Sequence, residues 1–162
     1  APLAEPLVAE GEVRAGLLHD LRLERDVPQP LRDGSVFRIG QEIIKFEAIP
    51  PVKTGPNGEE LMGSPDPGFL GRILLVVGRD TYGNAYPIPP DGMHLGRERG
   101  DIIFPDDGYV SGLHCRLHSV SGQVHITDVG SSNGSFIRIT QTTPLKLGSL
   151  LLLGQQLFRL DG

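Results

Sequence analysis

The sequence predicts an all-β protein built as an antiparallel β-sandwich. Short apolar runs recur along the chain with turn-forming residues between them, which is the pattern of many short strands. The 162 residues include 22 glycines and 14 prolines, which favour turns over long helices. No segment has a convincing helical stripe, whereas Val124 and Ile126 alternate with polar neighbours, as in a strand with one buried face.

The expected strands follow one another from residue 72 to the end of the chain. The breaker Pro89-Pro90-Asp91-Gly92 separates the second strand from the third. Both Gly83-Asn84 and Ser121-Gly122 have the composition of tight hairpin turns. The strands expected on these grounds span residues 73–77, 82–87, 93–95, 101–104, 113–120, 123–128, 135–139, 149–153 and 156–160.

The front of the chain partly repeats its end. Residues 30–46 match residues 144–160 at a constant offset, with identical residues at Pro30 and Pro144, Gly34 and Gly148, Ser35 and Ser149, Gly40 and Gly154, and Gln41 and Gln155. Residues 21–25 are expected to form a further strand that parallels residues 136–139, with one residue more in the connection. We therefore divide the chain into a partial repeat (1–49), a linker rich in Pro and Gly (50–68) and a complete domain (69–162).

Composition argues against several classes of partner. The formal net charge is −5, and a sequence pI of about 5.5 without a basic stripe excludes nucleic acid as the partner. The excess acidity lies in residues 1–68, which hold 7 Lys and Arg against 12 Asp and Glu, while residues 69–162 hold 8 of each. No run of about 18 apolar residues predicts a membrane span, so no membrane contact is expected.

The single cysteine, Cys115, excludes an internal disulfide and fits a reducing compartment, so we expect a cytoplasmic protein. Its place in an apolar–polar alternation predicts a core residue rather than a reactive thiol. Nothing at the start of the chain has the form of a secretory signal. The chain begins at Ala1 and not at Met, which leaves room for an upstream portion.

Three polar clusters lie between the apolar runs of the complete domain. They are Gly96-Arg97, Ser111-Gly-Leu-His114 and Ser131-Ser-Asn133-Gly-Ser-Phe136. Their positions predict loops that converge on one end of a sandwich. A guanidinium, hydroxyls, a carboxamide and glycines together suit a phosphate ester, which needs a fork-shaped cation and several short donors.

The order and spacing of these clusters resemble the forkhead-associated (FHA) domain, a reader of phosphothreonine peptides. The resemblance covers roughly residues 69–161 and also implies that the repeated strands at the front are the last strands of a second FHA domain. That front copy lacks all three polar clusters, so residues 1–48 are not expected to bind phosphate. It is either the tail of a first domain whose front lies upstream or a decayed repeat.

The resemblance implies a role for each residue of the site. Arg97 contacts the phosphate, the hydroxyl of Ser111 binds it, Ser132 helps to shape the pocket, and Asn133 contacts the peptide main chain. Arg99 lies on the same side of an extended segment and is a candidate second cation. Gly112 can offer its amide, but it stands where family members often carry a basic or polar residue, which predicts weaker binding. The residues expected to support the site are Gly96, His114, which braces the serine loop, and Gly134, which permits a left-handed turn.

Other interpretations of the same residues are weaker. Alone, Arg97 would be a surface arginine paired with Glu98 or Asp101, and Asn133-Gly134 would be a plain hairpin turn. Ser111, His114 and Asp128 match the members of a hydrolase triad but lack the Gly-x-Ser-x-Gly elbow. Along a strand, His114 and His118 would lie roughly 13 Å apart, too far for one metal ion. We expect no catalytic set, no metal and no cofactor.

The sequence therefore predicts a phosphopeptide-binding signalling module that recognises phosphothreonine in a partner after a Ser/Thr kinase has acted. The alternative is an FHA-like structural or self-association module with weakened phosphate binding. Isolated strands with open edges rarely stand alone, so the front strands are expected to pack on the complete domain or to pair with a second chain. Such pairing would give a homodimer through the N-terminal strands.

Overall fold

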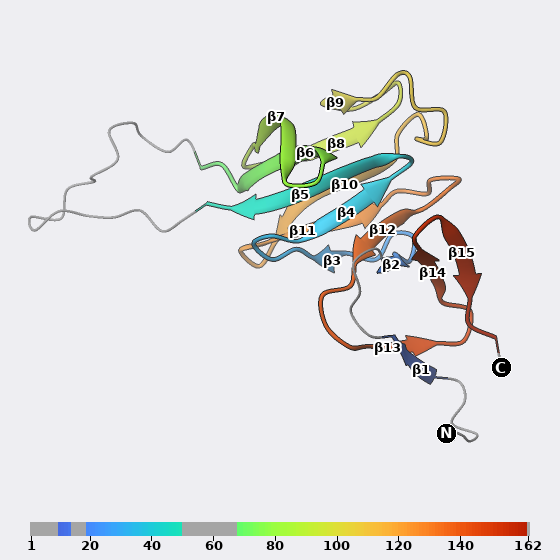
Figure 1. Cartoon of the computed structure of the whole chain (residues 1–162). Coiled ribbons are helices and arrows are strands. Elements are labelled where there is room, and N and C mark those ends of the chain that lie inside the picture. The colour runs from blue at the N-terminus through green and yellow to red at the C-terminus, as the bar shows by residue number, and fades with distance from the viewer. Residues whose placement is uncertain (1–9, 14–18, 50–67, 162) are drawn as a thin grey trace, which may run out of the picture.

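The computed structural model describes residues 10–13, 19–49 and 68–161, and in these residues it contains fifteen strands and no helix (Figure 1). The part of the chain described therefore offers no helix able to cross a membrane. The strands are β1 (Glu10–Val13), β2 (His19–Arg22), β3 (Gln29–Pro30), β4 (Val36–Ile39), β5 (Glu42–Ala48), β6 (Gly71–Gly78), β7 (Thr81–Ile88), β8 (Met93–Gly96), β9 (Ile102–Ile103), β10 (Cys115–Val120), β11 (Gln123–Asp128), β12 (Ser135–Arg138), β13 (Thr143–Lys146), β14 (Leu150–Leu153) and β15 (Gln156–Arg159).

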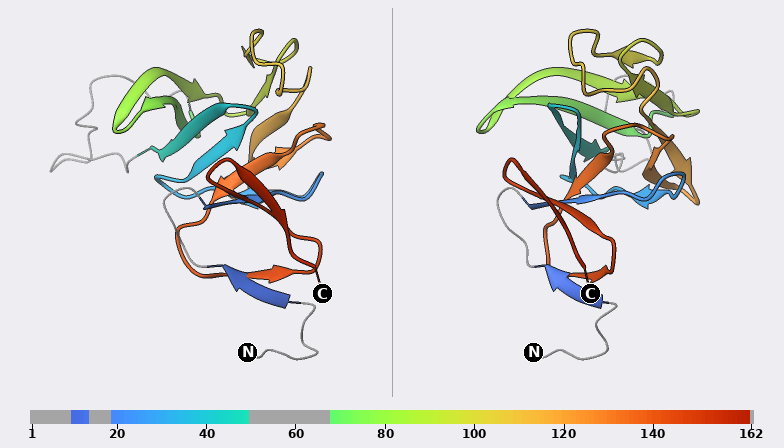
Figure 2. Two further views of the ribbon diagram at one scale, coloured as in Figure 1. Left: turned by 45° about the vertical axis from the view of Figure 1, so that its right-hand side comes forward. Right: turned by 90° about the vertical axis from the view of Figure 1, so that its right-hand side faces the viewer.

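Two sheets form the sandwich, as the sequence predicts (Figure 2). One has five strands in the order β3-β11-β10-β8-β9, and the other has eight in the order β15-β14-β2-β12-β4-β5-β6-β7. Pairing is antiparallel except between β8 and β9. Both sheets contribute to one apolar core, in which the largest fully buried aliphatic and aromatic side chains are Leu31, Phe37, Ile39, Ile44, Ile73, Ile88, Leu95, Leu117 and Ile126.

The front strands occupy places inside this sandwich. Strand β3 pairs with β11, β4 lies between β12 and β5, and β5 pairs with β6 over residues 43–48. Phe37 on β4 and Ile44 on β5 are 1% and 0% exposed. The sandwich is thus built from β6–β12 together with β3, β4 and β5, and its strand pairing crosses the division of the chain expected from the sequence.

The C-terminal strands lie at the other end of the larger sheet. Strand β14 pairs with β2 and β15, and β13 pairs with β1 in a separate two-stranded sheet. Figures 1 and 2 show these strands together on the side of the molecule away from β6 and β7. The last strands of the complete domain therefore pair with the first strands of the front copy.

The two copies are related by a local twofold arrangement. Strands β2 and β12 pair antiparallel with Leu21 opposite Ile137 at the centre. On one side Ile137 faces Phe37 of β4, and on the other Leu21 faces the equivalent Leu151 of β14. The turns repeat as well, because the Gly34 amide donates to the Phe46 carbonyl and the Gly148 amide to the Leu160 carbonyl, each at 2.8 Å.

This register corrects one detail of the sequence prediction. Leu21 is equivalent to Ile137 and not to Phe136, so the connection from β2 to Pro30 is two residues longer than its counterpart, not one. A slip by one residue would turn Leu21 away from the small apolar cluster of Ile139, Leu145 and Leu151 that it packs against.

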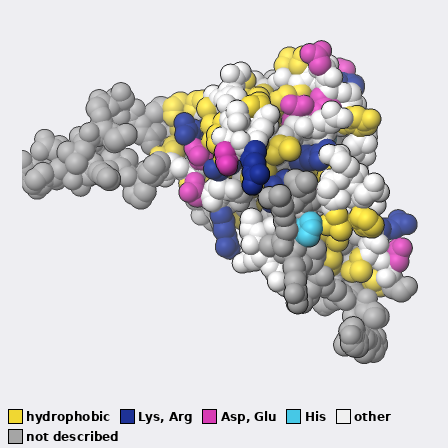
Figure 3. Space-filling model, viewed as in Figure 1, with side chains coloured by type: hydrophobic (Ala, Val, Ile, Leu, Met, Phe, Trp, Pro, Cys, Tyr) yellow, Lys and Arg dark blue, Asp and Glu magenta, His cyan; other side chains and the backbone are white. Residues whose placement is uncertain are grey.

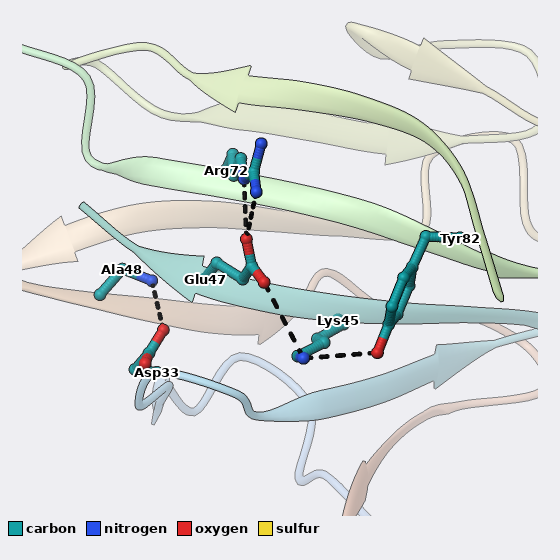
Figure 4. A network of polar contacts seen from close by, with 6 residues as sticks. All are labelled: Asp33, Lys45, Glu47, Ala48, Arg72 and Tyr82. Carbon is teal, nitrogen blue, oxygen red and sulfur yellow. Dashed lines mark hydrogen bonds and ion pairs between the residues drawn. The ribbon is translucent and has the colours of Figure 1, made fainter. Parts of the chain in front are cut away.

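Polar contacts tie the front hairpin to the first hairpin of the complete domain (Figure 4). Arg72 on β6 contacts Glu47 on β5 through Nε at 2.8 Å and Nη2 at 2.7 Å. Lys45 lies 3.8 Å from the same carboxylate and 3.4 Å from the Tyr82 hydroxyl on β7. Solvent-accessible ion pairs of this kind contribute little to stability.

The individual strands and turns agree with most of the sequence expectations. The turn at Ser121-Gly122 is confirmed, since both residues have positive φ, 51° and 82°. The prediction of a turn at Gly83-Asn84 is wrong, because both residues lie inside β7. The chain turns instead at Arg79-Asp80, where Asp80 has φ 54°. Strand β13 was not expected, and the expected linker lies, apart from Gly68, outside the described residues.

Equivalent residues in the two hairpins should differ in their effect on stability. Ile44→Ala should lower the free energy of unfolding by about 2–4 kcal/mol, because it leaves a cavity in the core. Phe158→Ala, at the equivalent position but 49% exposed, should cost less than about 1 kcal/mol. Urea unfolding followed by circular dichroism measures both. A larger loss for Phe158→Ala would mean that β15, and not β5, is covered by β6.

Candidate functional site

Three loops meet at one end of the sandwich and border a depression of about 440 Å³. They are residues 97–101 between β8 and β9, residues 104–114 between β9 and β10, and residues 129–134 between β11 and β12. All six residues that the sequence predicts for binding line this depression, namely Arg97, Arg99, Ser111, Gly112, Ser132 and Asn133. Their roles in binding remain predictions, but their convergence on one place is a property of the structure.

Backbone hydrogen bonds hold the first two loops side by side. The Arg97 amide donates to the Ser111 carbonyl at 2.8 Å, and the Arg99 amide donates to the Gly112 carbonyl at 2.9 Å. Gly96 makes this approach possible, because a Cβ at its position would lie 2.3 Å from the Gly112 carbonyl oxygen. Gly96 therefore permits the close approach of the first two loops, and its support of a binding site stays a prediction.

His114 joins the second loop to the third from a fully buried position. Its Nδ1 accepts a hydrogen bond from the Ser111 amide at 3.0 Å, and its Nε2 donates to the Gly134 carbonyl at 2.9 Å. These partners require the neutral ring with its proton on Nε2. Burial lowers the pKa of His114 and outweighs the hydrogen bond to Gly134 and the charges of Asp128 and Asp107, which act to raise it. The neutral ring therefore bridges the second and third loops.

Asp128 organises the third loop, a role that the sequence analysis did not assign. Its Oδ1 accepts from the amides of Gly130 at 2.8 Å and Ser131 at 2.9 Å, and its Oδ2 accepts from the hydroxyls of Ser131 at 2.5 Å and Ser135 at 2.6 Å. Burial opposes ionisation, but these four hydrogen bonds lower the pKa of Asp128. An Asp followed by a Gly-Ser turn is the sequence signal that would have found it.

Ser111 and Ser132 are linked directly. The Ser132 amide donates to Ser111 Oγ at 3.0 Å, so the serine oxygen is used as an acceptor. Among the described residues, the Ser111 hydroxyl donates its proton to no acceptor. That proton is therefore available to a group that enters the depression.

Asn133 is held by a contact that the sequence did not suggest. Its Nδ2 donates to the Tyr109 carbonyl at 3.1 Å, which braces the second loop from the third. The carboxamide oxygen of Asn133 accepts no hydrogen bond from the described residues. Asn133 can thus support the loop and still offer an acceptor to a peptide amide.

Two guanidinium groups border the depression. Arg97 Nη2 lies 3.3 Å from Glu98 Oε1, with the two side chains 37% and 67% exposed. Such a pair is weak in water, and an anion of higher charge can compete for the guanidinium. The Arg99 guanidinium lies beside Gly112, with its Nη2 3.6 Å from where a Cβ would be placed.

The front copy also reaches this end of the sandwich. A Cβ at Gly40 would lie 2.7 Å from Val110 and 2.8 Å from the Asp107 carboxylate, so the β4–β5 turn packs tightly on the second loop. The Gln41 amide donates to Asp107 Oδ2 at 2.8 Å. Burial raises the pKa of Glu42 to about 7, with a further contribution from its hydrogen bond to Asp107 and the charge of that carboxylate. The front copy thereby helps to position the loop that carries Ser111.

Two residues near the depression were not predicted. Tyr109 is 57% exposed and lines it, and its place in the long polar loop was the available signal. The Arg25 guanidinium lies against Gly130, 3.0 Å from where a Cβ would be. No sequence signal indicated Arg25, because it belongs to the front copy and is distant in the chain.

Neither a metal site nor a reactive thiol is evident where the structure is described. No group of three or more His, Cys, Asp or Glu in the described residues is arranged to hold a metal ion. Cys115 is buried in the core, as expected, and burial raises the pKa of its thiol.

A two-sheet sandwich that presents a cluster of loops with hydroxyls, amides and guanidinium groups defines a recognition module on a rigid scaffold. A family model described as the FHA domain matches residues 76–154, and this part of the chain belongs to the FHA domain family. FHA domains are phosphopeptide-binding recognition modules and not enzymes. No curated protein matches the chain, and no solved structure matches it either.

The Glu42–Asp107 contact should make stability depend on pH. Because the folded protein holds the Glu42 proton up to about pH 7 and the unfolded chain releases it near 4.5, the unfolded state binds fewer protons in this window. Stability contributed here is complete below about pH 4.5 and falls as the pH rises through 7. Glu42→Gln should remove this fall, which urea unfolding from pH 4.5 to 8 would measure.

Gln156→Glu provides the matched control, because Gln156 is the exposed equivalent of Glu42 at the start of β15. It should leave the pH dependence as in the wild type. A Glu42→Gln protein with an unchanged slope would show that the contact is not made in solution.

Proposed function

We propose that this FHA domain binds phosphothreonine-containing segments of a partner protein after phosphorylation by a Ser/Thr kinase. The observation that carries the proposal is the meeting of Arg97, the Ser111 hydroxyl and the third loop around one depression. A phosphate monoester brings about two negative charges and three strong acceptors at pH 7. Arg97 would supply charge-assisted hydrogen bonds, and Ser111 would donate its unused proton.

The expected affinity follows from the number of contacts. Three hydrogen bonds to a charged group contribute roughly 1.5–3 kcal/mol each, or about 5–9 kcal/mol before ordering losses. Before those losses, this range corresponds to dissociation constants from roughly 200 μM to roughly 0.3 μM, which suits reversible signalling. Gly112 supplies an amide but no charge, so the proposed affinity is at the weak end.

Three further features support a peptide with phosphothreonine. Leu113 and Val129 line the depression beside the polar groups and offer an apolar surface to the threonine methyl group. Asn133 keeps a carboxamide oxygen for the peptide main chain, as argued from its contact with Tyr109. Arg99 would hold a second phosphate oxygen or an acidic neighbour in the peptide.

The alternative, a structural module, is favoured by a different observation. The C-terminal hairpin leaves Leu157 and Phe158 exposed by 56% and 49%, which is unusual for apolar residues of a sandwich strand. The front strands β2–β5 find partners within the chain, so a homodimer through them would have to replace these pairings. Both functions are compatible in one protein.

Removing the Arg97 guanidinium should strongly weaken the binding of a phosphopeptide. Arg97→Ala should weaken binding of a phosphothreonine peptide by at least tenfold, because it removes charge-assisted hydrogen bonds from the phosphate. Fluorescence anisotropy with phosphothreonine, phosphoserine and unphosphorylated peptides from a degenerate library measures this and the preference for threonine. Arg116→Ala is the control, since Arg116 is exposed on β10 and does not line the depression. Equal affinity of the Arg97→Ala and Arg116→Ala proteins would refute the proposed site.

Adding a cation at Gly112 should strengthen binding. The atoms nearest to a Cβ there belong to Arg99, at 3.6 Å and 3.9 Å, and to Glu98, at 3.9 Å, which is ordinary contact, so a Cβ fits. Gly112→Lys should tighten binding a few-fold at low salt, and Gly112→Glu should weaken it. The same anisotropy assay at two salt concentrations tests both. A Gly112→Lys protein that binds more weakly than Gly112→Glu would show that the phosphate lies elsewhere.

A further inference from the structure

The chain contains the closing strands of an FHA sandwich twice and the opening strands once. The opening strands are β6–β10, and the closing strands are β11–β15 or their front equivalents β1–β5. Strand β1 is the front equivalent of β11. It pairs with β13, with Glu12 opposite Pro144, in the same way that β11 pairs with β3, with His125 opposite Pro30. One closing set must therefore lack opening strands within the chain.

In the front closing set, the β4–β5 hairpin is covered by the opening strand β6. The outer edge of β5 pairs with β6 from Ile43 opposite Val76 to Ala48 opposite Gly71. This contact leaves Ile44 0% and Phe46 2% exposed.

The C-terminal hairpin lacks that cover. Strand β15 ends the larger sheet, and among the described strands only β14 pairs with it. Phe158, the equivalent of Ile44, is 49% exposed, and Leu157, the equivalent of Ile43, is 56% exposed. On the face seen in Figure 3, hydrophobic side chains gather over this hairpin.

The charges beside β15 repeat those beside β5. Lys45 and Glu47 of the front hairpin are equivalent to Arg159 and Asp161, which lie 3.4 Å apart. In the front hairpin Glu47 receives Arg72 of β6, as Figure 4 shows. Asp161 is thus placed to form an ion pair with a basic residue of a strand that pairs with β15.

We propose that the edge of β15 binds the opening strands of a second FHA sandwich, with a strand equivalent to β6 pairing antiparallel along Gln156–Arg159. The incoming strand would be apolar on its inner face and would carry a basic residue opposite Asp161. The described residues of 1–162 hold two closing sets and one opening set, so pairing two copies of these residues leaves one closing set in each copy without opening strands. The partner is therefore a further opening set and not a second copy of the chain.

The probe is a synthetic peptide of residues 69–90, which spans the β6–β7 hairpin, titrated into the full chain by isothermal calorimetry. One peptide should bind per chain, and hydrogen exchange should slow at the amides of β15. Phe158→Lys should weaken binding at least tenfold. Val120→Lys, a change at an apolar residue 38% exposed on β10, should leave it unchanged.

A charge exchange tests the register without depending on one variant. Asp161→Arg in the chain should weaken binding of the wild-type peptide, and a peptide with Arg72→Glu should restore it. Absence of peptide binding would overturn the proposal. So would slowed exchange at β5 in place of β15, or a dimer of the chain in sedimentation velocity that Phe158→Lys dissolves.

Discussion

The structure depends on the pairing of β4 with β12 and of β5 with β6, which joins β12 to β6 in the larger sheet. The gap in the larger sheet is filled by a two-stranded hairpin, β4–β5, whose Phe37, Ile39 and Ile44 sit in the core with at most 1% exposure. The hairpin comes from the front of the chain, although the FHA match runs on to residue 154, within the C-terminal copy. Because the two copies share turns and register, either one has the geometry to close a sandwich. The hairpin packed against β6 buries Ile44, whereas the equivalent Phe158 of the C-terminal hairpin is 49% exposed.

The position of the β4–β5 hairpin also brings its turn against the recognition loops. The β4–β5 turn packs against Val110 and Asp107, while the equivalent turn at Gly154 has no atoms within 4 Å of a Cβ position. The serine loop is thus held from two sides, by this turn and by His114. A loop restrained in this manner loses less conformational freedom on binding a peptide, which favours affinity.

The sequence predicted the fold and the convergence of the site through turn residues and loop motifs, which act locally. Ser121-Gly122 specified its turn, and the spacing of Arg97, Ser111 and Asn133 indicated loops that meet. Gly83-Asn84 misled because a glycine can also lie within a strand of a long, bulged hairpin. The sequence could not predict which of the two equivalent hairpins pairs with β6. Ile44 and Phe158 occupy the same position in the repeat, and only three-dimensional packing distinguishes them.

The buried position of Cys115 has a practical consequence for experiments on this chain. With no exposed surface and a thiol whose pKa is raised by burial, this sole cysteine should not react with alkylating reagents while the protein is folded. A cysteine introduced beside the loops would therefore carry a fluorescent label at a single known position. Occupancy of the depression could then be followed by the emission of that dye, without prior removal of the native thiol.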